Sequence, residues 1–143
     1  SNLGNILMDL GKEKKAELSY RRAIELRPNY ADAHSNLGNV LRNFGKLQEA
    51  ELHTRKAIKL NPDFPNAHYN LGNILCDLCK FQDAELHIRK AIELNPDFAD
   101  AHINLRNILV SQGKFKESRL YCEKIMSKRP WSILGSYGFN YEI

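Results

Sequence analysis

Apolar residues along most of this chain recur every three or four positions, which is the spacing of one face of an α-helix. Within residues 31–64 the spacing occurs twice, and the pair Gly45-Lys46 separates the two rows. The first row is Ala33, Leu37, Leu41 and Phe44, and the second is Leu47, Ala50, Ala57, Ile58 and Leu60. Glycine can adopt the left-handed conformation that ends a helix, and Pro62 stops the second row because proline lacks an amide hydrogen. The pattern predicts two helices joined by a tight turn.

The same pattern returns with a fixed period of 34 residues, marked by Pro28, Pro62, Pro96 and Pro130. Small residues recur in columns, which are Gly4, Gly38 and Gly72, then Gly11, Gly45, Cys79 and Gly113, then Ala16, Ala50, Ala84 and Ser118. Small side chains allow antiparallel helices to approach to about 8 to 10 Å. A single hairpin cannot cover its own apolar face, so the period predicts a stacked array of hairpins.

The array divides at the recurring signals. We expect a truncated repeat at residues 1–30, repeats at 31–64, 65–98 and 99–132, and a C-terminal tail at 133–143 that caps the array or links it to a following segment. Gly11 stands where the other repeats place their turn, so the truncated repeat should turn there. The residues after each proline, Asn29, Asp63 and Asp97, are predicted to cap the next first helix.

Several segments together resemble the tetratricopeptide repeat family: Asn36-Leu37-Gly38-Asn39, Gly45-Lys46-Leu47-Gln48-Glu49-Ala50 and Ala57-Ile58-Lys59-Leu60-Asn61-Pro62. The resemblance covers residues 1–130, and the wording is similar to repeats of O-GlcNAc transferases and of bacterial repeat proteins. It implies an all-α fold, a right-handed superhelical array whose inner surface is lined mainly by the first helix of each repeat. It also implies a scaffold that binds protein segments.

Asparagines recur on this first-helix face in two columns three residues apart, so they share one side of the helix. Side-chain amides both donate and accept hydrogen bonds, and a ladder of them can pair with the backbone of an extended peptide. The alternative is that they tie one hairpin to the next or face water. The predicted peptide-binding residues are Asn36, Asn39, Asn70, Asn73, Asn104, Asn107, Tyr69 and Arg42.

Other candidate chemistry is weaker. His34, His68 and His102 are one repeat apart, too far to share a metal ion, so we expect them to pack partly buried near helix starts. Cys76 and Cys79 form a lone Cys-x-x-Cys with no second pair, and Cys79 stands in the turn-glycine column. No catalytic motif is present, so we predict no enzymatic activity, no cofactor and no metal.

Composition sets the remaining expectations. The chain has 143 residues, is 43% hydrophobic and 27% charged, and carries a net charge of +4 with acids and bases interleaved. Three cysteines do not suggest a disulfide framework, which favours a cytoplasmic protein. We expect a protein or peptide partner, neither nucleic acid nor membrane, and a possible homodimer through exposed terminal repeats. A substrate-recognition region of a larger enzyme, such as a glycosyltransferase, and a self-assembling module are the alternatives.

Overall fold

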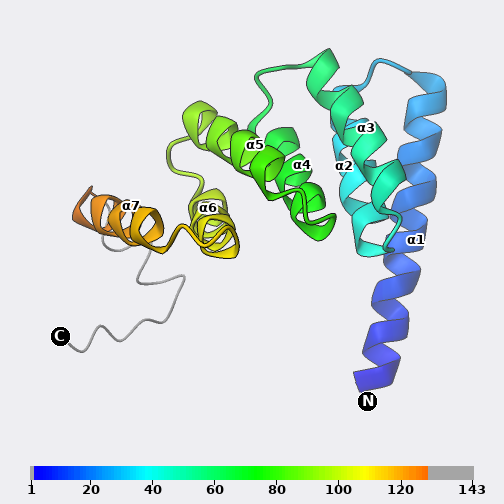
Figure 1. The fold of residues 1–143 in the computed structure, drawn as a ribbon. Coiled ribbons are helices and arrows are strands. Elements are labelled where there is room, and N and C mark those ends of the chain that lie inside the picture. Colours follow the sequence, from blue (N-terminus) through cyan, green and yellow to red (C-terminus); the bar gives the residue numbers. More distant parts are fainter. Residues whose placement is uncertain (1, 129–143) are drawn as a thin grey trace.

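The computed structural model describes residues 2–128, and these residues form seven helices and no strand (Figure 1). The helices are α1 (Asn2–Leu26), α2 (Ala31–Asn43), α3 (Leu47–Leu60), α4 (Pro65–Asp77), α5 (Phe81–Leu94), α6 (Ala99–Ser111) and α7 (Phe115–Lys128). The pairs α2/α3, α4/α5 and α6/α7 pack as hairpins and stack in chain order into a right-handed α-solenoid. The predicted tail, 133–143, lies outside the described residues.

Each hairpin turns where the sequence predicts it. Gly45, Cys79 and Gly113 have φ angles of 76°, 59° and 75°, the left-handed conformation expected at a helix C-terminus. The amide of the next residue then donates back into the helix that has just ended, as Lys46 N does to Leu41 O at 2.9 Å. This bond satisfies a carbonyl that the end of the helix leaves without a partner.

The small-residue columns lie where the two helices of a hairpin are closest. A Cβ on Gly38 would stand 2.0 Å from Thr54 Oγ1, and a Cβ on Gly72 would stand 2.5 Å from Ile88 Cδ1. The alanines of the second helices, Ala50, Ala57, Ala84 and Ala91, are fully buried. Glycine on one helix and alanine on the other therefore allow the close packing that the repeat requires.

The first helices begin differently from the prediction. Their N-cap residues are Tyr30, Phe64 and Phe98, none of which makes a side-chain cap hydrogen bond, so the predicted capping by Asn29, Asp63 and Asp97 is wrong. Instead the backbone amides of Asp63 and Asp97 donate hydrogen bonds to Asn61 Oδ1 and Asn95 Oδ1 at 3.3 Å. The acidic residues thus belong to the turn between repeats, and aromatic residues occupy the cap positions.

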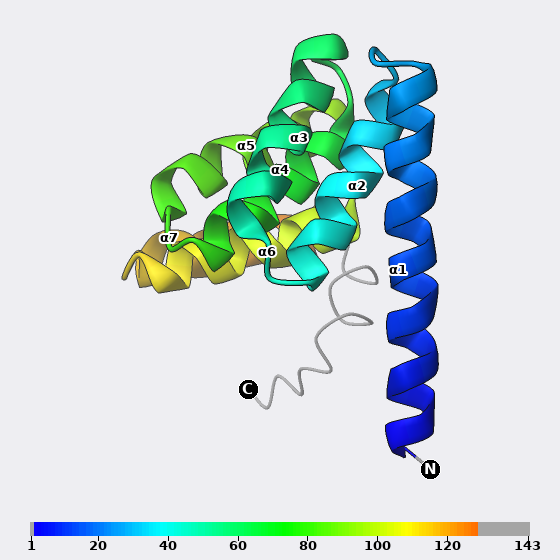
Figure 2. The same cartoon turned by 90° about the vertical axis from the view of Figure 1, so that its right-hand side faces the viewer.

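The N-terminal segment also departs from the prediction. Helix α1 continues through Gly11 without a turn, and its N-terminal half projects beyond the packed helices (Figure 1, Figure 2). Leu3, Leu7 and Leu10 are 65%, 60% and 45% exposed, so no described element covers this half. Without burial to reward folding back at Gly11, a continuous helix keeps its backbone hydrogen bonds and is the state observed.

The first helices lie on the inside of the curve. The backbone of α2 contacts that of α4, and α4 contacts α6, whereas the backbones of the second helices α3, α5 and α7 do not approach one another. Elements that crowd together must line the concave side of a curved stack. Within residues 2–128, no helix has the length and apolarity needed to cross a membrane.

Candidate peptide-binding face

The predicted asparagine columns fall on this concave side. On α2, Asn36 and Asn39 are exposed, and their side chains have no hydrogen bond to the described part of the chain. On α4 and α6, Asn70, Asn73 and Asn104 are half-buried, while Asn107 is exposed. The amides of this face are therefore exposed at Asn36 and Asn39 on α2 and at Asn107 on α6.

The half-buried asparagines connect neighbouring repeats. Asn70 Nδ2 on α4 donates to Ser35 Oγ on α2 at 3.1 Å, and Ser35 itself is 1% exposed. Asn104 Nδ2 on α6 donates to Asn73 Oδ1 on α4 in a short hydrogen bond. Part of the ladder thus ties first helices together, the structural alternative that the sequence left open.

Four of the predicted residues meet at one cavity between the first helices. Arg42, Asn73, Asn104 and Asn107 line it, together with Cys76, Phe81, Ile108 and Ser111. Its volume is about 220 Å³, below the range of about 300 to 1,000 Å³ typical of small-molecule sites. A pocket of this size, with an apolar side and an amide rim, suits one side chain of a larger partner.

Arg42 is not a free cation at this cavity. Its Nε donates to Asp77 Oδ2 at 2.6 Å, which joins the first helices α2 and α4. Asp32 and Asp100 are exposed near the starts of α2 and α6. The concave face is consequently mixed in sign, and it offers hydrogen-bonding groups more than net charge.

Tyr69, one of the predicted binding residues, also packs within the array. Its ring lies 4.7 Å from the ring of Phe98, centroid to centroid, and the pair packs against the hydrophobic core between the third and fourth repeats. Tyr69 is half-buried. This aromatic side chain therefore helps to pack the third repeat against the fourth, and its binding role stays a prediction.

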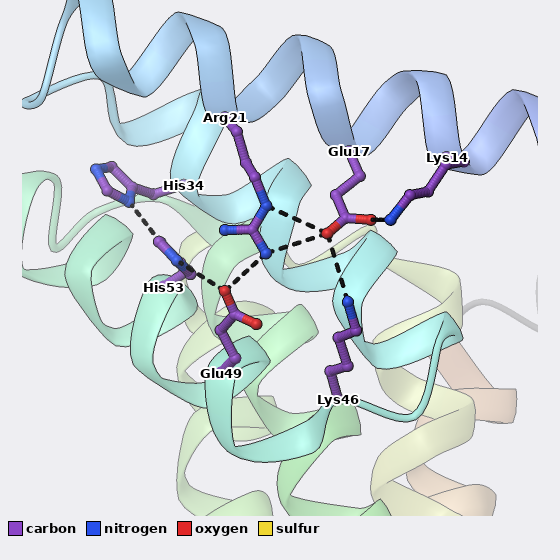
Figure 3. Close-up of polar contacts among 7 residues, drawn as sticks. All are labelled: Lys14, Glu17, Arg21, His34, Lys46, Glu49 and His53. Carbon is purple, nitrogen blue, oxygen red and sulfur yellow. Dashed lines mark hydrogen bonds and ion pairs between the residues drawn. The ribbon is translucent and has the colours of Figure 1, made fainter.

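The recurring histidines are buried near the starts of first helices, as predicted: His34, His68 and His102 are 5%, 6% and 9% exposed. Each places Nε2 at 2.8 Å from the carbonyl oxygen of the repeat-ending proline, as His34 does with Pro28. Nδ1 of His34 lies 3.1 Å from Nδ1 of His53, as Figure 3 shows. Nδ1 of His68 lies 3.2 Å from Nδ1 of His87, and Nδ1 of His102 contacts the hydroxyl of Tyr121. The histidines therefore close each hairpin at its open end.

A second recurring contact was missed by the sequence analysis. One glutamate in each of α1, α3 and α5 pairs with an arginine one turn later and with the lysine that follows the next hairpin turn. These glutamates are Glu17, Glu51 and Glu85. Figure 3 shows the first example, where Glu17 is 3% exposed and contacts Lys14, Arg21 and Lys46. The signal available in the sequence was the column Lys46, Lys80 and Lys114.

The charges in this contact are complementary. Burial raises the pKa of Glu17, but hydrogen bonds from Lys14 and Arg21 outweigh it, so the pKa of this carboxyl lies below its ordinary value. The pKa values of Glu51 and Glu85 are lowered for the same reasons. The three glutamates thus stay ionised and hold successive repeats together.

The cysteines show no sign of a reactive site. Burial, followed by the nearby charge of Asp77, raises the pKa of Cys76 to about 11, which keeps the thiol protonated at neutral pH. Cys79 is exposed in its turn, and burial raises the pKa of Cys122. Among residues 2–128, no group of three or more His, Cys, Asp or Glu side chains is arranged to hold a metal ion.

Comparison with solved structures gives the same fold. A crystal structure of MamA protein matches with a TM-score of 0.77 and 24% identity, over 99% of this chain and 76% of that one. MamA from residue 41 onward, of Desulfovibrio magneticus RS-1, matches with a TM-score of 0.76 and 22% identity, over 96% and 75%. A mutant O-GlcNAc transferase of Thermobaculum terrenum matches with a TM-score of 0.68 and 29% identity, over 70% of this chain and 19% of that one.

Family models identify the repeat itself. One described as TPR repeat matches residues 4–45, and one described as Tetratricopeptide repeat matches residues 31–64 and 65–98. Comparison with curated protein sequences gives no match. The matched segments together span 4–98, well over half of the chain, and their helices form the hairpins described above. The chain belongs to the tetratricopeptide repeat family.

Proposed function

We propose that this chain is a non-catalytic scaffold that holds an extended segment of a partner protein on its concave face. The observation that carries the proposal is the exposed amide row of α2, formed by Asn36 and Asn39, which leads to the cavity beside Arg42. These positions are three residues apart and share one side of the helix. A partner backbone lying across them meets donors and acceptors that residues 2–128 do not use.

The remaining features of the face fit a peptide better than a rigid ligand. Half-buried Asn73 and Asn104 are already bonded to each other, so they offer their remaining donor and acceptor capacity at fixed positions. The cavity beside them accepts one side chain, with Phe81 and Ile108 on its apolar side. Ordering a flexible segment consumes much of the binding energy, so we expect an affinity near micromolar, about −8 kcal/mol.

Substitution of the exposed amides tests the proposal. Peptides selected against the wild-type chain from a random library would be titrated calorimetrically into the double variant Asn36→Ala/Asn39→Ala. We expect binding to weaken about tenfold with helicity unchanged, because neither side chain supports the fold. The matched control is Gln48→Ala/Gln82→Ala, which removes two exposed amides from the second helices. Equal loss in both variants, or no loss in either, would contradict the proposal.

A role within a larger enzyme is the second candidate. It is favoured by the likeness to the O-GlcNAc transferase structure, of which the matched part is 19%. In that case the same concave face would present a substrate segment to a catalytic domain elsewhere. The polypeptide encoded beyond Ile143 distinguishes the two candidates, since a transferase domain there would support the second.

Self-association through the ends of the array is a third candidate, favoured by the exposed Leu3 and Leu7 on the projecting half of α1. We expect neither nucleic acid nor membrane as the main partner. Arginines of the second helices, which could contact phosphates, are engaged by acids, as in the pairs of Arg55 with Glu51 and Arg89 with Glu85. Light scattering over a range of concentrations tests the third candidate.

A further inference from the structure

One apolar feature on the outer face is explained neither by the core nor by the concave face. The second helices, including the second half of α1, carry a leucine at the same repeat position, and we call this set the outer leucine row. Its members Leu18, Leu52, Leu86 and Leu120 are 59%, 68%, 66% and 52% exposed. A single exposed leucine needs no explanation, but one that returns at every repeat on the same face forms a surface.

Ion pairs connect the row from one second helix to the next. Arg21, one turn after Leu18, contacts Glu49, one turn before Leu52, at 2.7 Å (Figure 3). Arg89 contacts Glu117 in the same way at 3.1 Å, between α5 and α7. These two bridges connect α1 to α3 and α5 to α7, and the ion pair of Lys80 with Glu51 at 3.3 Å connects the start of α5 to α3. The leucines beside these contacts are therefore held on a common outer surface.

The charges beside the row follow a regular order in the second, third and fourth repeats. Three positions before each leucine stands an acid, and four positions after it stands a lysine: Glu49 and Lys56, Asp83 and Lys90, Glu117 and Lys124. At 3.6 residues per turn, both positions lie on the same side of the leucine, separated by about two turns along the helix. The fourth repeat adds the reverse pair, Lys116 and Glu123, on the other side.

This order is self-complementary. A two-fold axis parallel to the leucine row reverses the helix direction of the second copy and keeps each repeat opposite itself. Leucine then faces leucine, and the acid of each pair faces the lysine of its partner. An axis along the helices would place acids on acids. A symmetric dimer requires one patch that complements itself, which the first arrangement provides.

We propose that a second copy of this chain docks on the outer leucine row, with the facing second helices antiparallel and with Leu86 at the centre of the contact between Leu52 and Leu120. In the first repeat Lys15 and Arg22 flank Leu18, so like charges would meet there, and the contact is limited to the second, third and fourth repeats. The surface is distinct from the concave face and from the projecting end of α1, so it leaves the peptide site open in the dimer.

Analytical ultracentrifugation of the full chain over a range of concentrations tests the docking surface. We expect a monomer–dimer equilibrium, and at least a tenfold rise in the dissociation constant in the variant Leu52→Glu/Leu86→Glu. The matched control is Leu26→Glu, because Leu26 is 68% exposed but lies outside the row. Circular dichroism confirms that each variant keeps its helices. A wild-type chain that stays monomeric, or a dimer weakened by Leu3→Glu/Leu7→Glu and not by the row variant, overturns the proposal.

Charge reversal tests the arrangement of the two copies. Asp83→Lys and Lys90→Asp should each weaken the dimer severalfold, because each brings like charges together across the two-fold axis. The double variant Asp83→Lys/Lys90→Asp restores the opposite charges and should return the dissociation constant to near the wild-type value. A double variant as weak as either single variant would exclude this pairing.

Discussion

His34 Nδ1 lies 3.1 Å from His53 Nδ1, and a nearby carbonyl oxygen determines which of these two nitrogens donates (Figure 3). Nε2 of His34 lies 2.8 Å from the carbonyl oxygen of Pro28, which can only accept, so Nε2 carries the proton and donates. The Nδ1 atom of neutral His34 is then an acceptor, and His53 must donate from its own Nδ1. The hydrogen bond therefore exists in this form only while Nδ1 of His34 carries no proton, whereas His53 can donate from Nδ1 whether or not its Nε2 is protonated.

The equivalent pair of His68 and His87 predicts acid sensitivity. Burial, followed by the proximity of His68 and Arg55, lowers the pKa of His87 to about 4, from about 6.5 in the unfolded chain. Between these values the unfolded chain binds a proton that the folded chain does not. The contribution of neutral His87 to the free energy of unfolding is thus complete above pH 6.5 and is lost as the pH falls toward 4. The loss is on the order of 2 kcal/mol.

Urea unfolding at pH 7 and pH 4.5 measures this loss. The variant His87→Tyr should reduce it, because the fourth repeat already uses Tyr121 at this position, where the hydroxyl contacts His102 Nδ1. The reciprocal variant Tyr121→His should increase the loss. An unchanged pH dependence in both variants would show that other groups cause the acid sensitivity.

The complete hairpins were predictable because their signals are local. The turn residues, the small columns and the prolines each act within one repeat, and helices α2 to α7 follow them. The conformation of residues 2–11 was not predictable from the repeat, because a turn at Gly11 forms only if something buries the leucines before it. That condition depends on neighbouring chain segments and not on the identity of residue 11.

For the candidate site, the sequence identifies the helix face that carries the asparagines but not the role of each side chain. Spacing places the asparagines on one side of each first helix, but it does not show which of them meet a neighbouring repeat. Asn70 contacts Ser35, 35 positions earlier in the sequence, and Tyr69 packs on Phe98, the residue that precedes helix α6. These partners depend on how the hairpins stack, so the division between structural and exposed amides required the structure.

The continuity of α1 predicts opposite effects for two similar substitutions. Gly11 is helical and a Cβ there would meet nothing within 4 Å, so Gly11→Ala should stabilise the local helix by about 1 kcal/mol. Gly45 has a φ of 76°, so Gly45→Ala should destabilise its hairpin by about 1 kcal/mol.

Amide hydrogen exchange resolves these local effects. In Gly11→Ala the amides of residues 2–11 should exchange about fivefold more slowly, the factor that corresponds to about 1 kcal/mol. Faster exchange in this segment would mean that residues 2–26 fold as a hairpin in solution.

The close approach of Gly72 to Ile88 predicts a steric cost. A Cβ at position 72 would stand 2.5 Å from both Cδ1 and Cγ1 of Ile88, whose fully buried side chain would have to shift against the core around it. Gly72→Ala should therefore destabilise the chain by about 1 to 3 kcal/mol in urea unfolding. In a double-mutant cycle with Ile88→Val, which removes Cδ1, part of this cost should disappear. Purely additive effects would place the strain elsewhere.

The left-handed backbone of Cys79 predicts a stabilising substitution. It has a φ of 59° at a position where the two other hairpins have glycine, and a left-handed conformation costs a side-chain-bearing residue about 1 to 2 kcal/mol. Cys79→Gly should stabilise the chain by about 1 kcal/mol, since the added freedom of glycine in the unfolded state offsets part of the gain. Urea unfolding under reducing conditions measures the change without disulfide chemistry. The control Gly113→Ala should lower the free energy of unfolding by a similar amount. A Cys79→Gly variant that is less stable than the wild type would show that the cysteine side chain itself supports the turn.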